Sequence, residues 1–190
     1  MQKSRVDVES KRTAALALWR YSHDYLRSAH TLCETDLIAC DESQVVYHLA
    51  AQGIEFALKS HLRASGLTPE DLNARIGHSL LDALQEAIAR DLSPPPAEVT
   101  RAIRFIAPYH RKDQFRYLGV SYGKFPDLVP LLAAGTWILG QVVEAVVTDY
   151  FLHHGNGTEM DRHDMRRRLH IDLGVTVSKV IPGKYPAARS

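Results

Sequence analysis

One helical stretch, VVYHLAAQGIEFALKSHLRASG at residues 45–66, constrains the fold more than any other part of the chain. Apolar residues cover most of its surface when it is drawn as a helix, so we expect it to pack against neighbours on several sides. Gly66 marks its C-terminal end. A narrow polar stripe interrupts the apolar surface, because four side chains fall within about 60° of one another on the helix: His48, Gln52, Glu55 and Lys59.

This polar stripe has two interpretations. In the first, it lines a groove or a subunit interface, where Glu55 and Lys59 form an ion pair because they stand four residues apart in the favourable order. In the second, it is only the solvent-facing side of an amphipathic helix. The sequence leaves both interpretations open.

Four further segments carry apolar residues at helical spacing. They are predicted over residues 8–31, from Ser79 to the proline run at 94–96, over 96–106, and from 125 to 151. With 45 % apolar residues among 190, the chain can bury a substantial core. We therefore predict an all-α fold, an up-and-down bundle of four or five helices, within a domain of residues 1–151.

Residues 152–190 are predicted to form a basic C-terminal extension. The formal net charge of +1 divides into +5 for residues 162–190 and −4 for residues 1–161. Apolar and polar residues alternate strictly from Leu169 to Ser178, a period-two pattern that predicts a strand. Because a lone strand cannot satisfy its backbone groups, we expect a hairpin or pairing with the same segment of another subunit. A disordered tail is the alternative.

The sequence predicts a cytoplasmic protein without a membrane span. The N-terminus, MQKSRVDVESKR, lacks the apolar core of a signal peptide. The most apolar run, residues 128–147, contains two glycines, a glutamine and a glutamate, and we expect it to be a buried helix. The two cysteines, Cys33 and Cys40, are too few for a disulfide framework.

Two strings of the sequence resemble the HEPN family, helical-bundle proteins of prokaryotic toxin, defence and stress systems. The string at 47–66 contains Gln52, Glu55 and Lys59 in the family's kind of spacing. The string GHSLLDALQEAIA at 77–89 begins a helix with His78, Ser79 and Leu80, as the family often does. The resemblance covers roughly residues 8–150, and it implies an HEPN-like bundle that forms a homodimer.

Many HEPN proteins are metal-independent ribonucleases whose motif is an arginine and a histidine separated by four to six residues, near a groove between two subunits. Arg104 and His110 match this motif, although Phe105 stands where the family usually has a polar residue and Pro108 interrupts the segment. The resemblance thus implies that Arg104 and His110 are catalytic. Imidazole can move protons near neutral pH, and guanidinium can stabilise an anionic phosphate. The same spacing also arises by chance, and then the pair is a structural arginine and a surface histidine.

The segment around this motif and beyond it is rich in cations and aromatic rings, which suit the phosphates and bases of single-stranded RNA. A solvated loop whose rings cover the end of the bundle is the alternative. The predicted RNA- or phosphate-binding residues are Arg101, Arg111, Lys112, Arg116, Tyr117 and Lys124.

Other chemistries lack support in the sequence. We find no phosphate-binding glycine loop, no dinucleotide fingerprint and no serine-hydrolase elbow. Histidines and aspartates at 153–164 match no standard set of metal ligands, so no metal and no cofactor are predicted.

The leading hypothesis is an HEPN-like homodimer that binds RNA or a nucleotide, and whether it also cleaves RNA stays open. The alternative hypothesis is a non-catalytic protein-interaction module of a stress or defence system, such as a toxin–antitoxin pair, that binds a protein partner.

Overall fold

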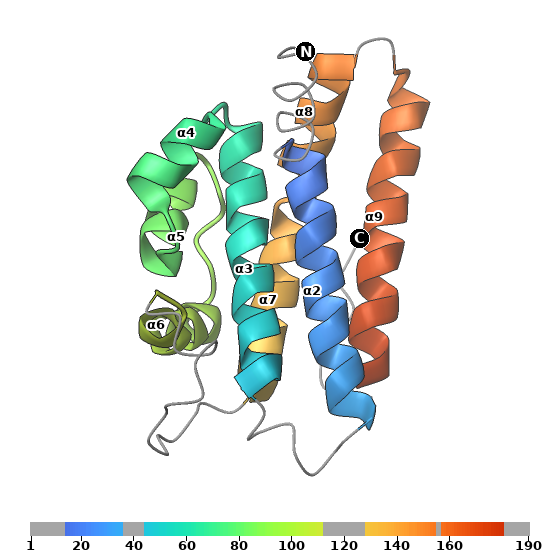
Figure 1. Cartoon of the computed structure of the whole chain (residues 1–190). Helices are drawn as coiled ribbons and strands as arrows, with labels where there is room; N and C mark the ends of the chain where they lie inside the picture. Colours follow the sequence, from blue (N-terminus) through green and yellow to red (C-terminus); the bar gives the residue numbers. More distant parts are fainter. Residues whose placement is uncertain (1–13, 36–43, 112–127, 155–156, 181–190) are drawn as a thin grey trace, which may run out of the picture.

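The computed structural model describes residues 14–35, 44–111, 128–154 and 157–180, with side chains described as far as Ile171. All regular secondary structure in these ranges is helical, which confirms the predicted all-α class. The long helices α2 (Ala15–Thr35) and α3 (Gln44–Ala64) lie side by side and run in opposite directions (Figure 1).

The remaining helices surround this pair. They are α4 (Pro69–Asp71), a π-helical turn η2 (Leu72–Ile76), α5 (Leu80–Ile88), α6 (Ala97–Arg111), α7 (Leu128–Gln141), α8 (Val143–His154) and α9 (Glu159–Val180). Helix α6 is seen end-on in Figure 1, so it crosses the bundle rather than running along it. The described part of the chain is therefore a helical bundle with one crosswise helix.

Helix α3 is the central element, because it contacts α2, α5, α6, α7 and α8. Fourteen of its 21 residues are buried. The buried set includes Gln52, Glu55 and Lys59, and His48 is half-buried. The polar stripe is therefore not a solvent-facing side of the helix, and that interpretation was wrong.

Two glycines let the three innermost helices approach closely around Leu26. A Cβ atom on Gly53 of α3 would lie 2.6 Å from Leu26 Cγ, and one on Gly135 of α7 would lie 2.5 Å from Leu26 Cδ2. Leu26 on α2 is 1 % exposed, so it cannot move aside into solvent. Ser22 adds a polar link at the same crossing, where its hydroxyl donates to the Gly53 carbonyl at 2.7 Å.

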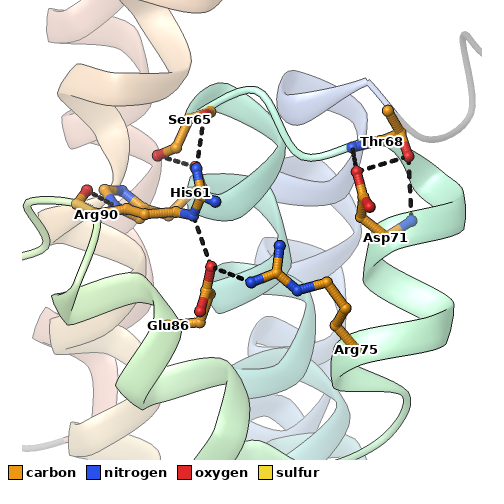
Figure 2. Close-up of polar contacts among 7 residues, drawn as sticks. All are labelled: His61, Ser65, Thr68, Asp71, Arg75, Glu86 and Arg90. Atoms are coloured by element: carbon orange, nitrogen blue, oxygen red, sulfur yellow. Dashed lines mark hydrogen bonds and ion pairs between the residues drawn. The ribbon is translucent and has the colours of Figure 1, made fainter.

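The loop and helices that follow α3 are fastened to it by a polar network (Figure 2). Arg90 donates to the Ser65 carbonyl at 3.2 Å and to Glu86 at 2.8 Å, and the ring of His61 bonds the Arg90 carbonyl at 2.8 Å. Thr68 and Asp71 cap α4 reciprocally, and Ser79 caps α5. The Arg90 contacts fasten the chain just after α5 to the C-terminal end of α3.

Helix α6 continues through Pro108 to Arg111, whereas the sequence predicted an end near Ile106. Pro108 is exposed, so its ring meets solvent rather than a packed neighbour. Proline cannot donate the backbone hydrogen bond of a helix interior, and this loss costs stability. Burial of Ile106, Ala107 and His110 on the opposite face of the helix offsets that cost.

Helices α7 and α8 meet at Val142 and replace the single long helix predicted for 125–151. Among the described residues, the span Leu128–His154 is long and apolar enough to cross a membrane by length and composition alone. However, 56 % of its most apolar window is buried inside the bundle, which is what the core helix of a packed domain also shows. The expected cytoplasmic location stays a prediction.

The C-terminal segment predicted as a strand is helical, and this prediction was wrong. Thr158 and Asp161 cap the first turn of α9 through three hydrogen bonds. Arg166 then pairs with Glu144 of α8 at 2.6 Å, and Leu169 is buried against the bundle. The cap begins the helix, and the ion pair and the buried Leu169 side chain hold the first part of α9 against the bundle. Backbone hydrogen bonds inside the helix then satisfy the groups that a lone strand would leave without partners. The division into 1–151 and 152–190 stays a prediction.

A buried histidine, His30 on α2, lies against α7. Its Nε2 is 3.5 Å from the Thr136 hydroxyl, and its Nδ1 has no hydrogen-bond partner among the described residues. Burial lowers the pKa of His30 from 6.5 to about 4. The fold therefore holds this imidazole in its neutral form.

We predict that Gly53→Ala destabilises the protein by about 1–3 kcal/mol, because the added methyl group collides with Leu26 and the small gain in helix propensity does not compensate. Urea unfolding measures the change. The double variant Gly53→Ala/Leu26→Ala should lose less stability than the sum of the single variants. Strict additivity would mean that Leu26 does not limit the crossing.

We also predict that His30 makes the fold sensitive to acid. The pKa of His30 is lower in the folded chain than in the unfolded chain. Its contribution to the free energy of unfolding is therefore complete above about pH 6.5 and is lost as the pH falls towards 4. The loss amounts to about 3 kcal/mol. The His30→Leu variant has no imidazole at this position and should not show this loss. The free energy of unfolding of the wild type, measured relative to that of the variant, should therefore fall as the pH is lowered from 7 to 4. The exposed His153→Leu variant is the control, and a difference independent of pH would contradict the prediction.

Candidate functional site

Three side chains from three parts of the chain converge on the buried carboxylate of Glu55. Glu55 and Lys59 come from α3, His78 stands just before α5, and His110 belongs to the last turn of α6. We call these four residues the Glu55 cluster. Their positions depend on the packing of α5 and α6 against α3, so the cluster is a product of tertiary structure and not of local sequence alone.

The carboxylate of Glu55 has a partner on each oxygen. Lys59 Nζ donates to Oε1 at 2.6 Å, and His110 Nε2 donates to Oε2 at 2.5 Å. His78 Nδ1 lies 3.2 Å from both oxygens. Glu55 is 2 % exposed and His110 is 4 % exposed, so these contacts are shielded from bulk water.

The electrostatics keep Glu55 ionised despite its burial. Burial is the largest single influence and would raise its pKa, but the hydrogen bond with His110 and the charge and hydrogen bond of Lys59 together outweigh it and hold the pKa at about 2. The buried anion is thus stabilised by a cation four residues along the same helix and by an imidazole from another helix.

His78 connects the cluster to solvent. Its side chain is 61 % exposed, whereas that of His110 is almost fully buried. The two rings lie edge to face, with centroids 6.4 Å apart and planes at 82°. A ligand approaching from solvent therefore meets His78 first and finds Glu55 and His110 behind it.

The structure separates the predicted catalytic pair within one chain. Arg104 is exposed on α6, and His110 is buried on its inner side. Six residues of helix place the two side chains about 120° apart around the axis. His110 joins Glu55 and Lys59 of the polar stripe, but Arg104 does not.

The exposed side of α6 carries several of the other predicted residues. Arg101, Arg104 and Arg111 are exposed there, and Phe105, which is 42 % exposed, stacks on Tyr109 with ring centroids 6.1 Å apart. The predicted residues Lys112, Arg116, Tyr117 and Lys124 lie outside the described residues.

A hollow lies elsewhere in the described part of the chain, between α2, α8 and α9. This cavity of about 500 Å³ is lined by side chains of both charges together with Trp19, which stacks on His23. One of its acidic residues, Asp161, is already engaged in capping α9. The cavity is remote from the Glu55 cluster, as none of its lining residues belongs to α3, α5 or α6.

Sequence reasoning found three members of the cluster and missed the role of the fourth. His78 was noted only within the family-like string GHSLLDAL. Its sequence neighbours, a glycine and a helix-capping serine, signal the start of a helix, but not which side chain that helix start faces. The proximity of His78 to Glu55 spans 23 residues and arises from the turn through α4 and η2.

The comparisons with known proteins give no family for this chain. No protein-family model matches it, and neither the curated proteins nor the solved structures contain a match. The resemblance to HEPN proteins stays a prediction from the two sequence strings.

The chemistry of the cluster combines an acceptor, a fixed cation and two imidazoles. A carboxylate that accepts a hydrogen bond from imidazole fixes the orientation of the ring and the nitrogen that carries the proton. An imidazole beside it at the surface can exchange protons with a bound molecule. The same nitrogen and oxygen atoms are also of the types that bind transition metal ions.

We predict that Glu55→Gln destabilises the protein by about 3–5 kcal/mol, because it leaves the Lys59 ammonium buried without a charged partner. Chemical denaturation measures the loss. Adding Lys59→Met should recover part of it, since the unpaired charge is then absent.

Glu86→Gln is the matched control, because Glu86 pairs with Arg90 at the same four-residue spacing but in a more exposed setting. It should cost much less stability than Glu55→Gln does, because solvent screens an exposed pair. Equal losses for the two glutamines would show that burial of the Glu55 pair does not matter.

Proposed function

We propose that this chain is an HEPN-like homodimer that binds single-stranded RNA or a nucleotide and cleaves RNA without a metal ion. The observation that carries the proposal is the position of His110, which is held by the Glu55 carboxylate directly behind the surface-exposed His78. Two imidazoles beside one fixed anion are suitable groups for moving protons near neutral pH.

The reaction needs two proton transfers, and the cluster offers two imidazoles. The RNA 2′-hydroxyl loses its proton to one imidazole as its oxygen bonds to the neighbouring phosphorus. The bond from phosphorus to the 5′-oxygen breaks, and that oxygen receives a proton from the other imidazole. The products are a 2′,3′-cyclic phosphate and a free 5′-hydroxyl, so atoms and charge balance without an added reagent.

Arg104 enters this proposal from the second subunit. Because Arg104 and His110 leave α6 about 120° apart, one chain cannot direct both towards the same phosphate. A twofold dimer that places α6 of one chain over His78 of the other would bring them together. The guanidinium then stabilises the phosphate with paired hydrogen bonds.

The exposed side of α6 supports the choice of RNA as ligand. Arg101 and Arg104 supply positive charge, and the stacked rings of Phe105 and Tyr109 supply an aromatic surface. Single-stranded RNA is bound by this combination, with cations on its phosphates and rings on its bases.

The second candidate function is a non-catalytic module that binds a partner protein in a stress or defence system. The observation that favours it is the burial of His110, which leaves 4 % of the residue exposed. In this case the Glu55 cluster only stabilises the bundle, and the exposed side of α6 contacts a protein.

We predict that the purified protein cleaves single-stranded RNA in excess chelator, and that His78→Ala, His110→Ala and Arg104→Ala each lower the rate by about a hundredfold or more. Circular dichroism checks folding, which matters most for the buried His110. Arg63→Ala is a control outside the cluster. If the wild type cleaves none of a set of varied RNAs, the interaction module replaces the nuclease.

Mixing two inactive variants tests the shared site. After subunits of Arg104→Ala and His78→Ala exchange, half of the dimers contain one intact site. Activity should then recover to roughly a quarter of the wild-type value. No recovery from variants that still dimerise would place both residues in a site within one chain, against the geometry of α6.

A further inference from the structure

We propose that the Glu55 cluster binds one transition metal ion, best Zn²⁺, through Glu55 Oε2, His78 Nδ1 and His110 Nε2, and that this ion inhibits rather than assists the proposed RNA cleavage. Each of these three residues offers one ligand atom within 4.8 Å of those of the other two. The binding half of this inference does not depend on the nuclease proposal.

The donor set and spacing suit zinc. Two imidazole nitrogens and one carboxylate oxygen are ligands of the borderline-soft ions, whereas Mg²⁺ and Ca²⁺ prefer oxygen. Bond lengths of about 2.0–2.1 Å place tetrahedral ligands about 3.3 Å apart. The 3.2 Å between His78 Nδ1 and Glu55 already matches this spacing. The 2.5 Å contact between His110 and Glu55 needs the ring to retreat slightly, and the Nε2 proton must leave to solvent as the ion binds.

The surroundings of the ligands also suit a metal site. Lys59 donates to Oε1, so it orients the carboxylate and leaves Oε2 to face the two imidazoles. His110 and Glu55 are buried and held by packing, while the exposed His78 gives an ion a route from solvent. Three protein ligands leave a fourth position for water.

Binding would have a mechanical and a chemical effect. The ligands come from α3, from the segment just before α5, and from α6, so one ion would join three parts of the fold. The ion would also take up the nitrogen lone pairs that proton transfer requires. Zn²⁺ should therefore raise thermal stability and lower RNA cleavage, and chelator should reverse both effects.

The test titrates metal-stripped protein with Co²⁺ as an absorbing substitute for Zn²⁺ and follows visible absorption, with Zn²⁺ then added in competition. We expect one tetrahedral Co²⁺ per chain and displacement by Zn²⁺. At a hundredfold excess over the dissociation constant, Zn²⁺ should raise the melting temperature by about 5 °C or more.

The variants assign the site. His78→Ala should weaken binding at least about tenfold and remain folded, because this side chain is exposed. His153→Ala, at an exposed histidine of α8, should bind as the wild type does. Unchanged binding in His78→Ala, loss in His153→Ala, or no binding by the wild type would overturn the metal site. If Zn²⁺ binds but RNA cleavage does not fall, the proposed inhibition is overturned and the metal site stands. If the protein does not cleave RNA at all, the Co²⁺ titration still decides whether the metal site exists.

Discussion

The ionised carboxylate of Glu55 is the constraint on which this structure depends most. A charge buried to this extent is stable only if neighbours compensate for the lost water. Lys59 supplies the compensating charge from within α3, and His110 supplies a hydrogen bond from α6. The crosswise position of α6 and the depth of α3 in the bundle are therefore matched to each other, since moving either helix would take the His110 hydrogen bond away from the buried anion.

The predictable parts of the fold are those that depend on local pattern. The existence of α2, α3, α5 and α6 follows from helical spacing and from caps such as Ser79 of α5, and the pairing of Glu55 with Lys59 follows from their separation along one helix. The contact between His78 and Glu55 was not predictable, because it requires the path of the chain through η2. The prediction of a strand from Leu169 onward was wrong for a similar reason. The alternation of apolar and polar residues is a local pattern, but the packing of α9 on α8 decided the conformation.

The candidate site divides α6 into two sides with different chemistry. The inner side holds an imidazole against a buried anion, and the outer side presents arginines beside stacked aromatic rings. The motif spacing of Arg104 and His110 is compatible with both proposed functions, since it says nothing about the direction in which each side chain leaves the helix. The burial of His110 shows that its side chain leaves α6 in a different direction from that of Arg104. Because the two directions differ, the nuclease proposal requires a second subunit.

Pro108 gives this division a further consequence. Proline removes the backbone hydrogen bond to the Arg104 carbonyl, so the last turn of α6 is joined to the rest of the helix by one hydrogen bond fewer. The side-chain hydrogen bond from His110 to Glu55 then helps to hold that turn in place. A substrate that takes Nε2 away from Glu55 would loosen the end of α6, whereas an ion bound by both groups would shift it slightly while keeping it tied to α3. Occupancy of the Glu55 cluster is thereby coupled to the position of the last turn of α6.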